Sequence, residues 1–495
     1  MTKEKPLQGM TAQPKNVEQS RTWTRAALTL DTGSMPSPQH LRAILASASL
    51  TFSLVTVILG LATGAWSQSA TIATGMTMFI FAVYSFRFAW ICFTAALTMS
   101  GISFQLFGLT VLPEQVLLTI LVVHAVRSQL AIAVRPPRRH KAVSRTRLVV
   151  AGLLIVCWLL VLTAFSAFSA PSPSQSLRLV IWVFVNVLAV FVVRCLAQNP
   201  ALLIKDALKI TNVMLIVFII GWLAANLSSS INIFVEADYA SSTYRLKGLM
   251  LEPNLLAALS LTWLCIGFVY RASIGNGLYW SSLAIMSFGI FMTYTRAAWL
   301  ILLALIICTL WTTFKAHRGL VVSGCLMVLP FIGFFVFDEA TGSTGSIADT
   351  IQARFSSILD FETGTGAYRA RTWEIAWQDI IRDGWWSGHG YNSFSQSHFS
   401  SETSNGTLYL GLLWLSLIYD GGLLSFLLFV SSLFLLWKSS LPHSAWFYVA
   451  FIVLSTSTNP TWFMFPWVLA ALLIAPRAPQ GSLELAQGKS ASVYG

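Results

Sequence analysis

Long apolar stretches separated by short polar turns make up most of the chain after residue 40. A helix needs roughly 20 apolar residues to cross the hydrocarbon core of a bilayer, and at least about eleven stretches fit that requirement. The pattern therefore predicts an all-α, polytopic membrane bundle of about twelve transmembrane helices, within a range of about 12 to 14. The stretches lie at about 41–64, 70–86, 88–110, 113–134, 148–169, 177–197, 210–227, 250–270, 277–293, 297–314, 320–337, 406–419, 421–438 and 444–475.

Polar segments divide this pattern into regions. Residues 1–40 contain no apolar core, which predicts a disordered cytoplasmic tail. The basic block 135–147 predicts a cytoplasmic loop, because cationic loops translocate poorly. Residues 41–475 then form a single membrane domain, in which the longest polar segment, 338–405, is a large external loop. Residues 476–495 form a C-terminal tail.

Composition supports the membrane class and limits the possible partners. Of the 495 residues, 56% are hydrophobic and 10% are charged, with a mean hydropathy of +0.70. The net charge of +12 sits largely beside predicted spans, where it suits lipid headgroups, so no nucleic-acid partner is expected. The six cysteines fall in or beside apolar runs without ligand spacing, and no metal site is predicted.

The external loop contains one predicted amphipathic helix, at about residues 367–383. Gly384 and Gly388 follow it as helix breakers. Because most of the chain faces lipid, this polar loop is where water-facing chemistry is expected. Apolar side chains recur at helical spacing at Trp373, Ala376, Trp377, Ile380 and Ile381.

Several basic residues fall on the predicted external side, where lysine and arginine are usually depleted. The guanidinium group stays charged and donates paired hydrogen bonds, so arginines that converge there suggest an anionic, diphosphate-like substrate. Pairing of each arginine with an acid of the same loop is the alternative. The external basic residues are Arg245, Lys247, Arg296, Arg354, Arg369, Arg371 and Arg382.

Three stretches resemble a known family. Arg369-x-x-x-Trp373, followed by Gly388-x-Gly390 and then Phe394, is similar to the signature of the O-antigen polymerase and O-antigen ligase superfamily. The segment 245–254, with an arginine, a glycine and a Pro-Asn pair, resembles the segment that opens a span in that family. Thr295-Arg296-Ala297-Ala298 resembles its external turn. Together the resemblance covers roughly residues 240–430.

The resemblance implies a helical bundle related to the C-type glycosyltransferases. Such enzymes act on undecaprenyl-diphosphate-linked oligosaccharides at the external face of the bacterial cytoplasmic (inner) membrane, without a metal or other cofactor. Some members join repeat units, and others transfer finished polymer to a lipid or another acceptor. Besides membrane lipids, a chain-length regulator or other polysaccharide-assembly proteins are possible partners.

The predicted site combines these residues. Arg245 and Arg369 would stabilise charge on the leaving diphosphate. The resemblance assigns the proton acceptor to His398, although the family's following asparagine is missing; Glu252 or a loop acid is the alternative base. Residues expected to bind substrate are Arg296, Arg371, Glu252, Trp373, Tyr391 and His389, the last being also the second candidate for the catalytic histidine.

The predicted function is therefore a membrane glycosyltransferase that polymerises lipid-linked repeat units. An O-antigen ligase is the alternative within the family, since both activities share fold and motifs. A transporter or flippase for a lipid-linked glycan is the alternative outside it. Transporters concentrate charge near the bilayer midplane and often contain related halves, neither of which is evident in this sequence.

Overall fold

The computed structural model describes residues 82–106, 109–133, 142–227, 233–237, 244–313, 364–398, 408–441 and 443–474. All of them belong to one compact unit, Ala82–Gly495. Both predicted tails, the run at 41–64, most of the run at 70–86 and the run at 320–337 lie outside the described residues. The same holds for 338–363 and 399–405 of the predicted external loop.

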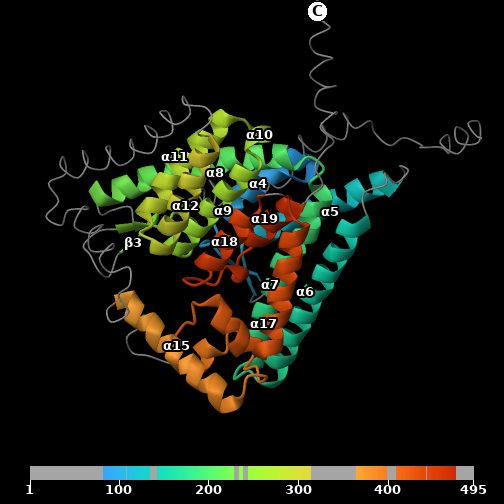
Figure 1. Cartoon of the computed structure of the whole chain (residues 1–495), viewed down its shortest axis with the longest axis vertical. Helices are drawn as coiled ribbons and strands as arrows, with labels where there is room; N and C mark the ends of the chain where they lie inside the picture. Colours follow the sequence, from blue (N-terminus) through green and yellow to red (C-terminus); the bar gives the residue numbers. More distant parts are fainter. Residues whose placement is uncertain are drawn as a thin grey trace, which may run out of the picture. The chain divides into compact units, whose positions relative to one another are not determined.

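The described chain is almost wholly helical, which confirms the helical class (Figure 1). Two short antiparallel hairpins are the exception, β1 with β2 and β3 with β4. The elements are α4 (Phe86–Leu97), β1 (Phe104–Leu106), β2 (Leu109–Val111), α5 (Pro113–Ala133), α6 (Ala142–Phe168), α7 (Pro173–Leu196), α8 (Pro200–Leu227), β3 (Val235–Ala237), β4 (Tyr244–Leu246), α9 (Pro253–Val269), α10 (Arg271–Ile274), α11 (Asn276–Met292), α12 (Arg296–Thr313), α15 (Gly364–Asp383), α16 (Phe394–Ser397), α17 (Leu413–Ser439), α18 (Ala445–Leu454), the 3₁₀ helix η1 (Pro460–Trp462) and α19 (Phe465–Ile474).

Within the described residues, four helices are long and apolar enough to cross a membrane. They are Thr146–Phe168, Pro173–Leu196, Pro200–Asn226 and Leu413–Ser439. Further apolar helices, such as α9 and α12, are shorter. These helices are consistent with a helical membrane protein, and the count of about twelve spans stays a prediction.

The predicted apolar run at 88–110 is not one helix. Helix α4 ends at Leu97, and the β1–β2 hairpin follows. The intervening turn packs tightly against another segment: the Gly101 amide donates to the Leu249 carbonyl over 2.9 Å. A Cβ on Gly101 would lie 2.5 Å from the Met250 carbonyl carbon. This tertiary contact, invisible in the apolar pattern, ends the helix early.

Helices α6 and α17 run side by side and form one wall of the bundle (Figure 1). The buried Trp158 of α6 donates from its indole nitrogen to the Ser425 hydroxyl of α17 over 3.0 Å. Its ring also packs against Phe429 at a centroid distance of 4.9 Å. The indole nitrogen, the one polar atom of this side chain, therefore has a hydrogen-bond partner within an apolar interface. A buried tryptophan usually has such a partner.

Helix α17 is broken at Gly422, which has φ 68° and ψ −179°. The break frees backbone groups that the segment after α15 then satisfies. The amides of His389 and Gly390 donate to the carbonyls of Tyr419 and Asp420 over 3.0 and 2.9 Å. Backbone that leaves the helix at membrane depth must find such protein partners. The predicted boundary between the apolar runs at 406–419 and 421–438 is thus a kink.

The last apolar run, 444–475, is divided into two helices. Helix α18 ends at Leu454 and α19 begins at Phe465, with Asn459 and Pro460 between them. The Asn459 side chain accepts from the Thr461 amide and so caps η1. This interruption forms a short polar loop, residues 455–459, in which Ser455, Thr458 and Asn459 are buried.

Gly422→Ala should destabilise the protein by about 1–3 kcal/mol, since this backbone region is accessible essentially to glycine alone. The added Cβ would also lie 2.6 Å from the Trp386 carbonyl oxygen. The thermal midpoint of the purified protein in detergent measures the loss. Gly277→Ala is the matched control, because nothing lies within 4 Å of the position of its Cβ. An equal effect of both substitutions would contradict the strained break.

Candidate functional site

The β3–β4 hairpin holds Arg245 at the end of α8. Glu236 and Arg245 are direct cross-strand partners, with 4.0 Å between a carboxylate oxygen and Nη1. The Trp222 indole of α8 donates to the Tyr244 carbonyl over 2.7 Å and fastens the hairpin. Opposite charges on facing strand positions stabilise such a pair.

Two further hydrogen bonds orient the Arg245 guanidinium, whose side chain is 13% exposed. Its Nε donates to the Thr293 carbonyl over 3.0 Å, and Nη2 donates to Oδ1 of Asn254 over 3.2 Å. The Thr295 hydroxyl donates to the same Asn254 oxygen over 3.0 Å. Arg296 follows at the start of α12 and is partly buried. Segments 245–254 and 295–298, noted separately in the sequence, are therefore one structural unit.

Glu252 occupies the N-cap position of α9, makes no capping hydrogen bond with its side chain, and is partly buried. The Thr458 hydroxyl donates to its Oε1 over 2.9 Å. Burial raises the pKa of the Glu252 carboxyl above its usual value, which the Thr458 hydrogen bond and the positive charges of Arg369 and Arg245 only partly offset. Such a carboxylate is a stronger base than a solvated one.

Arg369 reaches the same place from α15. Its Nη2 donates to the Ser457 carbonyl over 3.2 Å, next to the threonine that bonds Glu252. Burial lowers the pKa of the Arg369 guanidinium group. The negative charge of Glu252 opposes this shift, and the positive charge of Arg245 adds to it. Tyr368 anchors this end of α15, since its hydroxyl accepts from the Tyr409 amide over 2.7 Å.

Arg245, Glu252 and Arg369 thus interact electrostatically although they come from three separate segments. We call these three residues the charge cluster. Two guanidinium groups meet one carboxyl group whose ionisation burial disfavours. The cluster carries excess positive charge in partly buried surroundings, which suits a phosphate-bearing anion.

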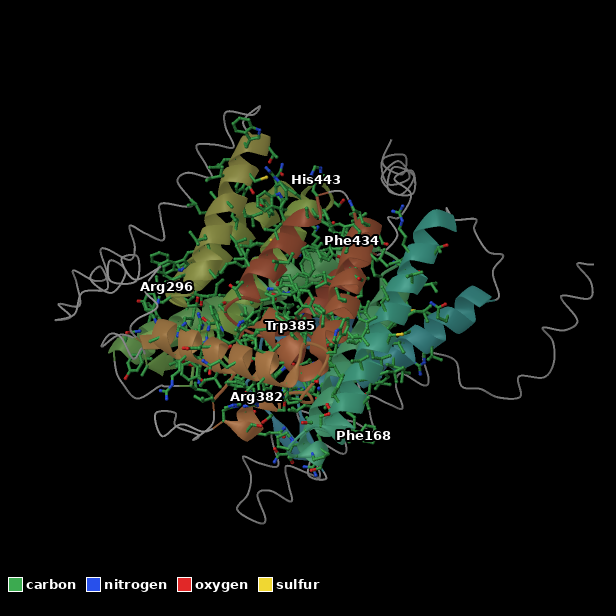
Figure 2. The ribbon with its side chains drawn as sticks, turned by 60° about the horizontal axis from the view of Figure 1, so that its bottom comes forward. Phe168, Arg296, Arg382, Trp385, Phe434 and His443 are labelled. Atoms are coloured by element: carbon green, nitrogen blue, oxygen red, sulfur yellow. The ribbon has the colours of Figure 1, made fainter. Side chains whose placement is uncertain are left out.

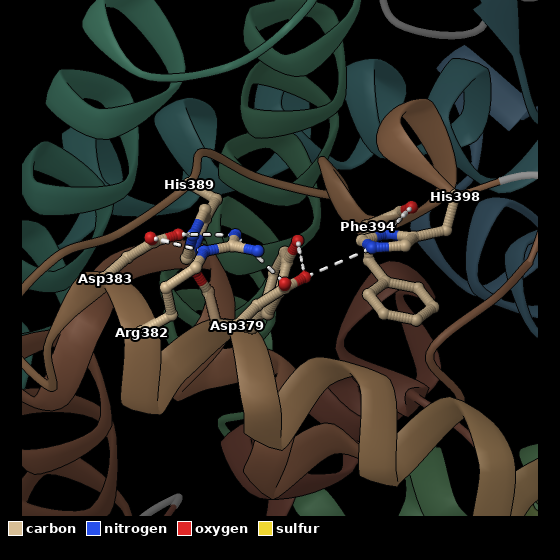
Figure 3. A network of polar contacts seen from close by, with 7 residues as sticks. Asp379, Arg382, Asp383, His389, Phe394 and His398 are labelled. Carbon is tan, nitrogen blue, oxygen red and sulfur yellow. Dashed lines mark hydrogen bonds and ion pairs between the residues drawn. The ribbon is translucent and has the colours of Figure 1, made fainter.

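The two candidate histidines belong to a second arrangement, which Figure 3 shows. Nε2 of His398 lies 3.1 Å from Asp379, and Nε2 of His389 lies 2.9 Å from Asp383. Arg382 joins the two carboxylates, with contacts of 3.0 and 2.9 Å. Hydrogen bonds from Arg382 and then His389 hold the pKa of Asp383 well below its usual range. We call these five residues the histidine–aspartate network.

The network holds both imidazole rings from two sides. Nδ1 of His389 faces the Tyr419 carbonyl at 3.1 Å, and Nδ1 of His398 faces the Phe394 carbonyl at 3.2 Å. Each imidazole ring thus has a carboxylate oxygen at Nε2 and a backbone carbonyl oxygen at Nδ1, and these contacts on both sides hold it in place. This arrangement suits fixing the loop after α15 better than accepting a proton.

The network is also distant from the charge cluster. Asp379, which contacts His398, follows Arg369 on α15 by ten residues, or about 15 Å at 1.5 Å per residue. Within the part of the chain described, no hydrogen bond or ion pair joins His398 to the charge cluster. The structure therefore brings Arg245, Glu252 and Arg369 together and leaves His398 and His389 apart from them.

The remaining residues that the sequence predicted to bind substrate differ in how exposed they are. Tyr391 is only 3% exposed and packs near Trp462, with ring centroids 6.0 Å apart. Trp373 is partly buried and packs against the cluster formed by Ala376, Ile380 and their neighbours. Both aromatic side chains therefore contribute to packing rather than to an open sugar-stacking surface. Arg371 lies on the exposed side of α15.

Sequence reasoning missed the loop 455–459 as part of the site. Thr458 and Ser457 connect Glu252 to Arg369, yet they follow an apolar run and match no motif. The available signal was the polar run Ser455-Thr456-Ser457-Thr458-Asn459 inside a stretch too long for one straight span. The contact between Asp379 and His398 has no signal in the sequence.

The comparison with protein families agrees with this geometry. Residues 281–430 match the family model Wzy_C, described as O-antigen ligase. This match supports the resemblance to the O-antigen ligase and polymerase superfamily that the sequence motifs indicated. The match includes Arg296, Arg369 and the whole histidine–aspartate network, while Arg245 and Glu252 lie upstream of it. No significant match is found among curated proteins.

Glu252→Gln should stabilise the fold at neutral and higher pH. When folding raises the pKa of a glutamate, its contribution to stability is fully present below the pKa of the unfolded state, near 4.5. That contribution is lost as the pH rises through the higher pKa of the folded state. Glutamine keeps the neutral form at every pH. Thermal midpoints of variant and natural chain should therefore coincide near pH 4 and diverge by pH 8.

Glu374→Gln, at an exposed position on α15, is the matched control and should show no such pH-dependent gain. If Glu252→Gln lowers the midpoint at pH 8, attraction to the two arginines outweighs burial and the assignment of a raised pKa is wrong.

Proposed function

We propose that this protein is a membrane glycosyltransferase that joins undecaprenyl-diphosphate-linked repeat units into a surface polysaccharide at the external face of the bacterial cytoplasmic membrane. The convergence of Arg245, Glu252 and Arg369 carries the proposal. The family match supports it, because members of this family are membrane glycosyltransferase-like enzymes. The predicted external orientation of the segments bearing the cluster agrees with it.

The guanidinium groups would bind the diphosphate of the donor. In the transfer, the bond between the sugar C1 and the diphosphate oxygen breaks, and its electron pair passes to that oxygen. Arg245 and Arg369 stabilise the developing negative charge. Arg245 is held by Thr293 and Asn254 before any substrate arrives, so little reorganisation is needed during the reaction.

Glu252 is the residue of the cluster that can take the proton of the acceptor. The acceptor hydroxyl oxygen bonds to C1, and its proton passes to the Glu252 carboxylate. Burial raises the pKa of Glu252, which improves its basicity. This assignment replaces the role that the family resemblance gave to His398, whose ring nitrogens face Asp379 and the Phe394 carbonyl. We assign His398 and His389 to holding α15 and the following loop.

An O-antigen ligase is the second candidate, favoured by the description of the matching family model. The same donor chemistry would then deliver polymer to a lipid or another acceptor. Purified protein with a defined lipid-linked repeat unit separates the candidates. Longer glycans on the polyprenyl carrier support a polymerase, glycan on an added acceptor supports a ligase, and translocation without a new linkage supports a transporter.

Arg245→Ala and Arg369→Ala should each reduce glycan transfer at least about 100-fold, as does loss of a donor that stabilises transition-state charge. The measurement is the initial rate of product formation at equal protein level in reconstituted membranes. Arg178→Ala removes an exposed arginine of α7 and is the charge-matched control, with an expected rate close to that of the natural chain. Near-normal transfer by Arg369→Ala would overturn the proposed diphosphate site.

Thr458→Val should shift the acidic limb of the pH–rate profile to higher pH. The Thr458 hydrogen bond lowers the pKa of Glu252, so its removal raises that pKa further. Because the base must be deprotonated, activity would be lost at a higher pH as the solution is acidified. Thr456→Val is the control, since the exposed Thr456 hydroxyl donates only to the Val453 carbonyl. An unshifted limb in Thr458→Val would exclude Glu252 as the base.

A further inference from the structure

The exposed side of α15 and the turn after it carries an apolar surface, formed by Trp377, Ile381, Trp385 and Trp386. Ile381 is 58% exposed and Trp386 is 65% exposed. Trp377 and Trp385 contact each other edge to face at 5.0 Å, so the surface is continuous. The helix itself buries its other apolar side, including Ala376 and Ile380, against the protein. We call the four exposed residues the tryptophan surface.

The rest of the exposed side of α15 is polar. Gln378, one position after Trp377, donates to the Glu374 carboxylate over 3.3 Å. Arg382 is 68% exposed. The helix therefore has a buried apolar face, an exposed apolar edge and an exposed polar edge. A helix with this division fits a boundary between hydrocarbon and water better than either medium alone.

The tryptophan surface continues onto a membrane span. The Trp385 carbonyl accepts from the Leu423 amide of α17 over 2.8 Å. The next exposed side chains of α17 are Leu424 and Leu427, which lie within the span Leu413–Ser439. Figure 2 turns this end of the molecule toward the viewer, with Trp385 and Arg382 labelled. The exposed leucines of α17 thus begin one residue after the position that bonds Trp385.

We propose that the tryptophan surface is inserted in the headgroup region of the lipid bilayer, on the side of the membrane where α15 lies. Tryptophan is enriched at this depth because its ring combines an apolar body with a polar N–H group. The polar edge, with Gln378 and Arg382, faces water. Because the tryptophan surface continues to the exposed leucines of α17, we identify lipid as the partner that covers it.

Insertion has a consequence for the charge cluster. The histidine–aspartate network fixes the C-terminal half of α15 to the loop that follows, and the Ser457 contact fixes Arg369 at the other end. A helix held at both ends and inserted along one edge keeps Arg369 near the depth of lipid phosphates. The insertion itself rests on the exposed surface alone and does not depend on the proposed glycan transfer.

Thiol accessibility tests the insertion. Cysteine is introduced singly as Ile381→Cys, Trp386→Cys or Gln378→Cys in the purified full-length chain, in nanodiscs of phosphatidylethanolamine and phosphatidylglycerol. Both membrane faces are open to a water-soluble maleimide in this preparation. The unsubstituted chain gives the background from native cysteines. Gln378→Cys should react at least tenfold faster than the other two, because a thiol surrounded by lipid meets neither water nor reagent.

Gln378 is the matched control, since it is exposed on the same helix as Ile381 but on the polar edge. Equal rates for all three variants would place the tryptophan surface in water and overturn the insertion. A protected Gln378→Cys would also overturn it, because the polar edge would then be covered. Neither outcome depends on an activity measurement, so loss of the insertion and loss of the proposed function are separately detectable.

Discussion

The site depends on one electrostatic constraint: partly buried charges must compensate one another. Glu252 lies where burial opposes its ionisation, and the two cations that favour ionisation are Arg369 and Arg245. Each arginine also needs hydrogen-bond acceptors, which Ser457, Thr293 and Asn254 provide. The hairpin, the external turn, α15 and the loop 455–459 together provide the charges and hydrogen-bond acceptors that partly offset this burial.

Interruptions of apolar helices supply the polar groups that this arrangement needs. The kink at Gly422 frees carbonyls that bind the backbone of His389 and Gly390, which anchors the segment after α15. The break at Asn459-Pro460 brings Ser457 and Thr458 to the charge cluster. In both cases, non-helical backbone among apolar helices is tolerated because protein groups satisfy it, and in both cases a segment of the candidate site is held as a result.

The sequence singled out the two arginines of the charge cluster but not the residues that surround them. Arg245 and Arg369 stood out because positive charge is unusual on the predicted external side, and the structure brings both to Glu252. His398 came from the family pattern, which says nothing of the contact with Asp379. Thr458 matched no motif, since a threonine that completes a site through one hydrogen bond has no sequence signature of its own.

The sequence by itself determined the helical class, the amphipathic α15 and the boundary between the apolar runs at 406–419 and 421–438. These features depend on the local periodicity of apolar residues and on the backbone conformations that glycine and proline adopt. Both can be read from residues that are neighbours in the sequence. Only the tertiary structure decided that Glu252 meets Thr458, 206 positions away, and that the histidines face aspartates. Such contacts depend on which helices pack together. The same pattern of apolar residues is compatible with many helix packings.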